Sequence, residues 1–599
     1  MCGIAGAVSS LPGQHVAIDA LRAASEAMLA RGPDGHGEWV AEAGDAALAH
    51  RRLAIIDLSS TANQPMRHAA GRYIISFNGE IYNYRELRAE LLAAGENLRT
   101  ESDTEVILAL YAKHGAAMLR RLRGMFAFAI WDEEDRSLFL ARDTFGIKPL
   151  YYCETGTEFR FASQVKALLT DPSISRKPDP VGYAGFRLWG SVPEPHTMFA
   201  AIRALPAGHS LTFRPGHPVP APTRFDSVAD ILSNGSDGRS DTGAALLDSV
   251  RHHLVSDVEV GCFLSGGVDS GALVGLMRDA GQEQIRTITL AFDEFANTPS
   301  DESARATVIA RHYGVDHSIA RITADDFHSS LPSILMAMDQ PSIDGVNSWF
   351  VSRAAHEHGL KVALSGLGGD ELLAGYSTFL AVPTMLARRA MLDRIPLLSP
   401  ALRSAWRALA PVLLKGMPKA PFALDYSDRL DRAYLLRRAI DPPERILAEG
   451  PSELLATGLI EIVEGCSLRA LLDPLPSGHN RQIAALECGH YMRNQLLRDT
   501  DWASMAHSLE VRVPLVDVPL TSSMAGKLGS LAWNDGKKLL ASAPARPLPR
   551  EIARQEKTGF AIPVATWLGQ TGSARQQRLQ GWSGRVLDSY VAETGLELP

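Results

Sequence analysis

The sequence predicts an α+β domain followed by an α/β domain with a parallel sheet, and the last part of the second domain is expected to be mostly helical. Three observations lead to this fold class. With 599 residues the chain is too long for one core, because domains usually run to about 100–200 residues. Short strand-like runs fill roughly the first third of the chain. Beyond them, apolar runs alternate with helical patterns, which is typical of a parallel sheet.

The strand-like runs of the first region are separated by Gly, Asn and Asp, as turns require. A helical pattern interrupts them at 85–95, with Gly95 as its stop signal. The region is therefore expected to be α+β. The strand-like runs are 51–58, 72–77, 125–132 and 137–142.

A stretch rich in Pro, Gly and Ser at 215–241 favours an exposed linker. After it, the apolar runs 258–264, 285–292 and 361–364 read as strands, and Gly/Ser turns and helical patterns lie between them. The expected division is 2–214 for the first domain, 215–241 for the linker, 242–570 for the second domain and 571–599 for a C-terminal tail.

Composition narrows the classes of function. The net charge is −8, which argues against nucleic acid or an anionic membrane as the main partner. The chain has no apolar run long enough to span a membrane, and its N-terminus has no basic flank of a signal peptide. The five cysteines are widely spaced without a CxxC pair, so neither a disulfide framework nor a zinc site is indicated. A cytoplasmic enzyme is expected.

Cys2 follows the initiator Met directly. Removal of Met1 would leave a free α-amine with an ordinary pKa of about 7.7–8, and this amine can act as a base toward the thiol of the same residue. Taken alone the signal is weak, since a small residue at position 2 is common.

Further motifs strengthen the signal that Cys2 is functional. Cys2 stands in CGIAG, and it is followed by RGPDG at 31–35, HRRLAIIDL at 50–58, NGEIYNY at 78–84 and SDTE at 102–105. In order and approximate spacing these resemble the N-terminal-nucleophile (Ntn) glutaminase domain of class II glutamine amidotransferases. The resemblance implies an Ntn hydrolase fold, glutamine as the nitrogen source and Cys2 as the nucleophile.

The same resemblance assigns roles that suit each residue type. Arg52 would bind the α-carboxylate of glutamine, since a guanidinium can donate to both oxygens, and Asp103 would bind the α-ammonium with help from Glu80. The side-chain amide of Asn78 and the N–H of Gly79 would stabilise the oxyanion. Outside the motif, Asn78-Gly79 reads as a turn dipeptide and Arg52 as a surface arginine. The RGPD turn reads as structural.

A second constellation begins at 265–270, SGGVDS, between an apolar strand and a helical pattern. A Gly-Gly turn at a helix start presents free N–H groups to an anion, and Asp269 can hold Mg²⁺. The motif resembles the loop of ATP pyrophosphatases, and the plainer alternative is a generic glycine turn. Together with a second motif at 365–376, SGLGGDELLAGY, it predicts the ATP-binding residues Leu264, Ser265, Gly266, Gly267, Asp269, Ser270, Ser365 and Gly366.

With both motifs, the sequence from 2 to about 567 resembles the glutamine-hydrolysing asparagine synthetase family, class B. The resemblance implies that Asp370 is the second magnesium carboxylate beside Asp269, and that Lys557 in RQEKTGFAIP is the active-site lysine. Arg498, Asp499 and Asp501 are interpreted as structural or site-supporting. Family members are often homodimers, so a homodimer is a possible state.

The implied reaction has two halves. Glutamine is hydrolysed at Cys2 to glutamate and ammonia, and Mg·ATP converts a carboxylate into an acyl-adenylate with release of pyrophosphate. Ammonia then displaces AMP to form the amide, with asparagine as the expected product from aspartate. Because ammonia is mostly protonated in water and then not nucleophilic, a shielded path between the two centres is expected.

Two positions depart from the family pattern. Leu367 lies where asparagine synthetases of the best-known type carry an acid, and Gln164 lies where Glu is frequent. Asp339 or Asp344 are candidates to compensate. Aspartate is therefore one candidate for the acceptor. The alternative is another carboxylate, on a sugar or a natural-product precursor. A non-catalytic scaffold or sensor and a glutaminase-only enzyme are minor alternatives.

Overall fold

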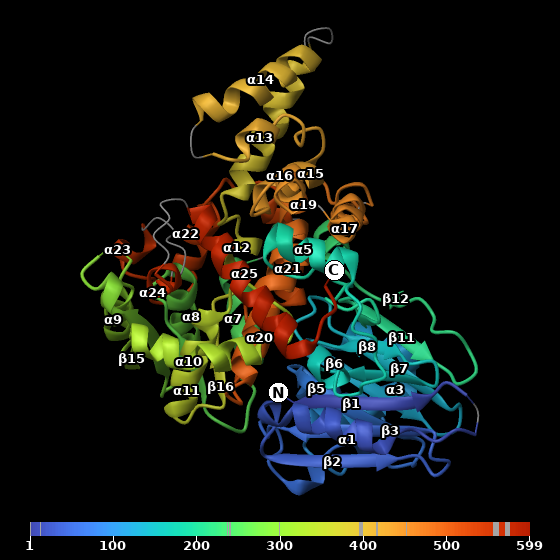
Figure 1. The fold of residues 1–599 in the computed structure, drawn as a ribbon. Coiled ribbons are helices and arrows are strands. Elements are labelled where there is room, and N and C mark those ends of the chain that lie inside the picture. The colour runs from blue at the N-terminus through green and yellow to red at the C-terminus, as the bar shows by residue number, and fades with distance from the viewer. Residues whose placement is uncertain are drawn as a thin grey trace.

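The computed structural model describes the chain except residues 1, 12, 236–237, 239–240, 299, 395–398, 415–416, 451, 466, 555–561, 570–574 and 599. The first domain lies at one end of the molecule, and a larger, mainly helical body lies beside and above it (Figure 1). The predicted Lys557 lies outside the described residues.

Two six-stranded antiparallel sheets form the first domain, with the orders β10-β8-β9-β1-β3-β2 and β12-β11-β7-β6-β5-β4. The first contains β1 (Gly3–Ser9), β2 (Gly35–Val40), β3 (Ala46–Arg52), β8 (Tyr151–Glu154), β9 (Glu158–Ala162) and β10 (Ile202–Ala204). The second contains β4 (Met66–Arg67), β5 (Tyr73–Ile81), β6 (Gly124–Asp132), β7 (Ser137–Arg142), β11 (His209–Phe213) and β12 (Thr223–Arg224).

The sheets pack face to face because alternate residues of their strands are apolar. Ile4 and Val8 of β1 share a buried cluster with Trp131 of β6, whereas Ala5 and Ala7 lie in the cluster on the other face, beneath α1 (Ile18–Ala27). Helix α3 (Asp103–His114) packs on β5 of the second sheet, and α2 (Tyr84–Ala93) packs beside it. This four-layered arrangement is the expected Ntn hydrolase class.

The second domain is built on a five-stranded parallel sheet of order β15-β14-β13-β16-β17. Val362 and Leu364 of β16 face one buried cluster with α8, and Ala363 between them faces another with α11. Helices therefore cover both faces, as a parallel sheet requires. The strands are β13 (Val260–Phe263), β14 (Arg286–Phe292), β15 (Asp316–Ile322), β16 (Val362–Leu364) and β17 (Glu510–Arg512).

Helices make up most of the remainder. Those within or before the sheet region are α4 (Val165–Leu168), α5 (Pro180–Trp189), α6 (Val228–Asn234), α7 (Thr242–His253), α8 (Val268–Asp279), α9 (Ser303–Tyr313), α10 (Ala324–Ala337), α11 (Val346–Glu357) and α12 (Gly369–Leu372). Beyond it lie α13 (Thr378–Leu392), α14 (Ser399–Leu413), α15 (Leu430–Arg438), α16 (Pro443–Glu449), α17 (Glu453–Glu464), α18 (Ser467–Ala470), α19 (His479–Leu486), the π-helix η6 (Glu487–Leu497), α20 (Arg498–Met505), α21 (Val518–Leu528), α22 (Asp535–Ser542), α23 (Arg550–Ala553), α24 (Val564–Trp567) and α25 (Arg575–Thr594).

Three local expectations need correction. The run 51–58 is strand only to Arg52, because beyond it the backbone pairs with Asp257 of the second domain instead of a sheet. The stretch 215–241 is not a bare linker: it contains β12 and α6, whose Ile231 and Leu232 are buried. The tail 571–599 includes α25, which packs on α10.

Candidate functional site

Cys2 lies buried at the start of β1, facing the second sheet. Its main-chain N–H donates to Oδ1 of Asn78 on β5 at 2.9 Å. This bond orients the amide of Asn78, whose buried Nδ2 has no hydrogen-bond partner among the described residues. The thiol and an unused amide donor are therefore held together, and burial raises the pKa of the Cys2 thiol above its ordinary value.

Gly79 follows Asn78 in a backbone conformation with φ of +156°. A Cβ atom there would lie 2.1 Å from the carbonyl oxygen of Met125 on β6. Only glycine fits this close approach of two strands, so the predicted oxyanion residue is also required by packing.

Arg52, at the end of β3, is held by the rim loop that follows. Its Nη1 donates to the carbonyl of Ser59 and to Oδ1 of Asn63, both at 2.8 Å, and Nη2 donates to the carbonyl of Asp57. None of these three acceptors is a carboxylate, so the contacts orient the guanidinium without neutralising its charge.

Asp103 and Glu80 are also buried near this end of β5. A carboxylate oxygen of Asp103 accepts the N–H of Ile81 at 3.0 Å, and burial raises the pKa of Asp103 to about 6. Glu80 approaches Arg512 of the second domain at 3.5 Å, and burial together with the charge of Glu510 raises the pKa of Glu80 well above its usual range. Glu80 thus faces the contact between the domains.

The predicted nucleotide loop lies between β13 and α8. The N–H of Ser265 donates to Oγ of Ser270 at 3.1 Å, so the loop closes on itself. Gly266 has φ of +70°, and a Cβ there would lie 2.8 Å from the carbonyl of Glu302. Six of the eight predicted ATP-binding residues line one cavity of about 250 Å³: Leu264, Ser265, Asp269, Ser270, Ser365 and Gly366.

Asp269 and Asp370 converge on one cation. Lys537 of α22 approaches both oxygens of Asp269 and Oδ1 of Asp370, each at 2.6 Å. Although burial disfavours the ammonium, the two carboxylates raise the pKa of Lys537 above its ordinary value. The two acids predicted to share a metal therefore do lie together, with the lysine ammonium between them. Sequence reasoning missed Lys537, and its only signal was a lysine beside the glycine in NDGKKLL.

The same cavity is also lined by Leu367 and by two acids, Asp344 and Asp499. Burial raises the pKa of Asp344, and burial together with the charge of Asp344 raises that of Asp499 to about 8. Asp499 also accepts hydrogen bonds from Ser342 at 2.7 Å and Trp502 at 2.9 Å. A pocket-lining role for Asp499 was not anticipated.

Asp339, the other candidate to compensate for Leu367, does not line this cavity. Its carboxylate accepts the N–H groups of Val165 and Lys166 at 2.9 and 3.0 Å, at the start of α4. It lies instead beside Gln164 in a second, small cavity of about 10 Å³. Such a volume is about that of one water-sized molecule.

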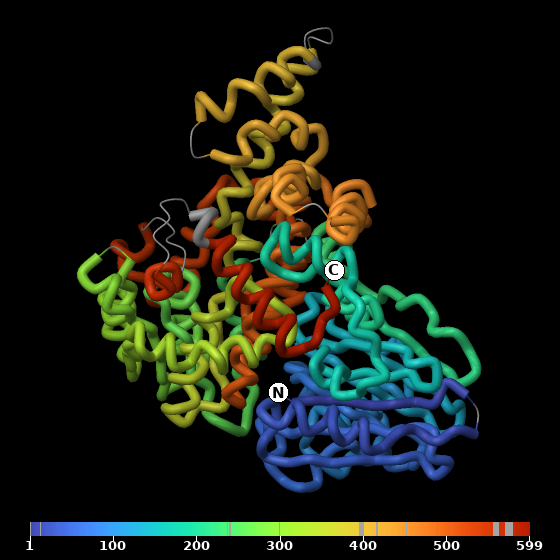
Figure 2. Tube along the Cα trace, in the orientation of Figure 1, coloured from blue at the N-terminus to red at the C-terminus, as the bar shows by residue number. Residues whose placement is uncertain are grey.

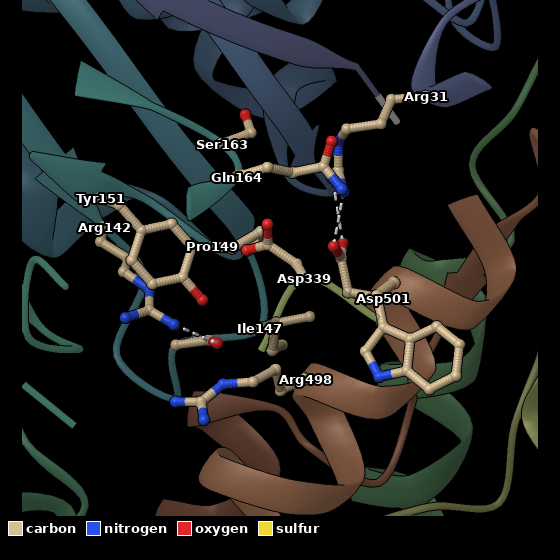
Figure 3. Close-up of a pocket in the computed structure, with 12 residues that line it drawn as sticks. Arg31, Arg142, Ile147, Pro149, Tyr151, Ser163, Gln164, Asp339, Arg498 and Asp501 are labelled. Atoms are coloured by element: carbon tan, nitrogen blue, oxygen red, sulfur yellow. Dashed lines mark hydrogen bonds and ion pairs between the residues drawn. The ribbon is translucent and has the colours of Figure 1, made fainter. Parts of the chain in front are cut away.

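This small cavity lies between the domains (Figure 3). A buried ion pair crosses it, in which Arg31 of the first domain donates to Asp501 of α20 at 2.7 and 3.2 Å. Arg31 also donates through Nε to the carbonyl of Cys2 at 3.0 Å. The RGPD arginine, interpreted as structural, therefore links the nucleophile's backbone to the second domain.

Helix α20 contributes to both cavities. Arg498, Asp501 and Trp502 line the small one, whereas Asp499 and Thr500 line the large one. One short helix thus separates the surroundings of Cys2 from the acidic part of the nucleotide cavity.

The remaining cysteines that the structure describes, Cys153, Cys262 and Cys488, are buried and unpaired. Cys466 lies outside the described residues.

Comparisons with known proteins agree with this architecture. A family model described as a glutamine amidotransferase domain matches residues 1–222, and one described as asparagine synthase matches residues 241–593. Asparagine synthetase [glutamine-hydrolyzing] 1 of Bacillus subtilis is 31% identical, over 95% of this chain and 88% of that protein. A putative asparagine synthetase of Mycobacterium bovis is 33% identical over the same shares. The amidase chry2 of Gibberella zeae is 27% identical over 92% of this chain and 86% of its own length.

Proposed function

Because this chain belongs to the glutamine-hydrolysing asparagine synthetase family, we propose that it amidates a small carboxylic acid through an acyl-adenylate, with L-aspartate as the first candidate. It is a glutamine-dependent ligase with an ATP-using synthetase domain. The observation that carries the proposal is the convergence of Asp269 and Asp370, from two Gly-rich turns at neighbouring strands, beside a cavity lined by the nucleotide loop.

In the first domain, the α-amine that is freed when Met1 is removed takes the thiol proton of Cys2, and the sulfur attacks the side-chain amide carbon of glutamine. The unused Nδ2 of Asn78 and the N–H of Gly79 donate to the developing oxyanion. Arg52 and Asp103 hold the two charged groups of the substrate's α-carbon. Collapse of this tetrahedral intermediate releases ammonia and leaves a thioester, which water hydrolyses to glutamate and the free thiol. Donors of this kind are worth about 2.7–4 kcal/mol each in related sites.

In the second domain, the carboxylate of the acceptor attacks the α-phosphate of ATP, and pyrophosphate leaves. The loop N–H groups at the start of α8 bind phosphate oxygens, and Lys537 offers positive charge to the leaving group. The donor set of Asp269 and Asp370 is all carboxylate oxygen and fits Mg²⁺, which would supply charge neutralisation for the phosphates. Lys557, in its family motif, is a further proposed cation.

We propose that ammonia passes from Cys2 along α20 to the adenylate. The small cavity at Arg31 and Asp501 adjoins the first centre, and Asp499 on the same helix lines the second. A buried Asp499 with a pKa of about 8 is suited to take a proton from the attacking ammonia, a task for which Leu367 has no group.

An Arg31→Met variant is expected to uncouple the two halves. Loss of one member of a buried ion pair lowers stability by about 3–5 kcal/mol. Here the loss weakens the contact between the domains that lies between the two centres. Glutamate released per AMP formed should rise several-fold, measured in one reaction mixture. Lys361→Met is the matched control, since its bond to Asp34 also joins the domains but is largely exposed. An unchanged ratio in Arg31→Met would contradict the proposed path.

Glutamine affinity is expected to depend on pH through Asp103. With its pKa raised to about 6, the carboxyl becomes neutral below that value and loses its attraction for the α-ammonium. Glutamine binding to a Cys2→Ala variant should therefore weaken about tenfold from pH 7 to pH 5, measured by calorimetry. Adding Asp103→Asn should weaken binding at pH 7 and remove the pH dependence. A double variant that keeps the same pH profile would show that another group titrates.

Two kinds of carboxylic acid are candidates for the acceptor: aspartate, and an acid with more apolar surface. Asp344 and Asp499 form an acidic part of the cavity that suits an acceptor carrying an ammonium group, as aspartate does. Leu367 and Leu496 in the same lining favour an acceptor with more apolar surface than aspartate. The relative named an amidase supports keeping such carboxylates as the second candidate.

A panel of carboxylic acids with glutamine and Mg·ATP tests the proposal. Pyrophosphate, AMP and the amide should appear together with at least one acid, and Asp344→Asn should reduce the rate with amine-bearing acids selectively. Pyrophosphate only with acids other than aspartate would select the second candidate. No pyrophosphate with any acid would favour a scaffold and overturn the proposal.

A further inference from the structure

An amphipathic helix turns its apolar side to solvent at the end of the molecule remote from the first domain. Helices α13 and α14 rise from the body, with α14 farthest out (Figures 1 and 2). Five of the exposed apolar side chains of α14 follow the spacing of one helix face. They are Leu402, Ala405, Leu409, Val412 and Leu413.

The side of α14 next to this stripe is the one that packs. Ala410 is fully buried, and the indole N–H of Trp406 donates to the carbonyl of Ala420 at 2.8 Å. Leu409 and Leu413, by contrast, are 55% and 67% exposed. The helix is thus fixed to the protein by its inner side, and its outer apolar stripe needs another partner. Exposed apolar residues extend beyond the helix to Met391 and Met417.

The charge of the segment that carries this stripe has the opposite sign to that of the whole chain. Although the net charge is −8, the segment 378–419 has seven basic residues and one acidic residue, Asp393. Arg388, Arg394 and Arg407 are exposed among the described residues of the segment. The basic residues are Arg388, Arg389, Arg394, Arg403, Arg407, Lys415 and Lys419.

We propose that the α13–α14 hairpin docks on the surface of an anionic lipid bilayer, with the apolar stripe of α14 inserted at the headgroup level. An apolar helix face among basic residues is the pattern of interfacial helices, and anionic lipids attract such basic residues. A second copy of this chain fits less well, because pairing two stripes would bring two sets of like charges together. No helix in the described part of the chain could cross a membrane, so the contact is peripheral.

The expectation that no membrane is a main partner came from the net charge. Screening limits exposed charges to a range of about 8–10 Å at ordinary salt. A bilayer that meets the hairpin therefore senses the local basic cluster and not the acidic surface elsewhere.

Flotation of the full-length protein with vesicles tests the proposal. The protein should float with vesicles of phosphatidylcholine containing phosphatidylglycerol and not with phosphatidylcholine alone, and binding should fall at about 1 M salt, where the Debye length is about 3 Å. Leu409→Asp with Leu413→Asp should lower the partition coefficient at least about tenfold. Arg388→Gln with Arg394→Gln should lower it by a similar factor.

Ile460→Asp with Leu475→Asp is the matched control, since these side chains are 57% and 67% exposed elsewhere on the synthetase domain. This variant should bind like the unaltered protein, and every variant should keep glutamine hydrolysis as evidence of folding. Failure to float with anionic vesicles would overturn the proposal. An equal loss of vesicle binding in the control would also overturn it. So would the finding that the protein is a dimer which the Leu409 and Leu413 changes dissociate while vesicle binding persists.

Discussion

Replacing Cys2 by alanine should abolish amide formation from glutamine and leave amide formation from added ammonia. The loss with glutamine should be at least about 10⁴-fold, the scale seen when a hydrolase loses its covalent nucleophile. The physical reason is that the thiol lies in the first domain, beside Asn78, whereas the proposed adenylation centre is at the carboxylates of the second. Both rates are measured as AMP and amide release, with glutamine or with ammonium chloride at high pH.

Cys153→Ala is the matched control. This cysteine is equally buried in the first domain and lies on β8 of the same sheet as β1, so its loss tests the effect of removing a buried thiol. Glutamine use should persist in it. Loss of ammonia-driven synthesis in Cys2→Ala, with the fold intact by circular dichroism, would contradict two separate centres.

Replacing Asp370 by asparagine should give the converse result. Glutamine hydrolysis should continue, whereas pyrophosphate release should fall about 10³-fold with either nitrogen source. The change removes one of two carboxylates that converge within 2.6 Å of Lys537, and charge stabilisation at a transferring phosphoryl group is worth several kcal/mol. Glutamate and pyrophosphate are assayed in parallel at rising magnesium concentration.

Asp535→Asn serves as its control. Asp535 begins α22, the helix that carries Lys537, but it is 43% exposed and pairs with Lys538. Pyrophosphate release should be unchanged there. If Asp370→Asn retained full pyrophosphate release, the paired carboxylates would have no part in the synthetase reaction.

The strands and their type were largely predictable. The run 125–132 became β6 over Gly124–Asp132, and 137–142 became β7 without any change. The run 51–58 failed as a strand after Arg52 because its backbone there is hydrogen-bonded to Asp257 of the second domain, a contact that local pattern cannot reveal. In 215–241, the Pro and Gly content hid a short helix, α6, which packs against α19 and α21.

The sequence by itself determined the family and, with it, glutamine-dependent amidation. Cys2, Asn78, Asp269 and Asp370 belong to short motifs in which backbone conformation and side chain are set by neighbouring residues, so local order suffices to propose them as site residues. What lies between the motifs depends on residues far apart in the chain.

Only the tertiary structure brought Lys537 to the two carboxylates, joined Arg31 to Asp501 and placed Asp499 rather than Asp339 beside Leu367. It also showed that the stripe of α14 faces solvent, since periodicity marks an apolar face without saying what covers it. These are contacts between elements, and their energy comes from burial and charge that exist only once the chain has folded.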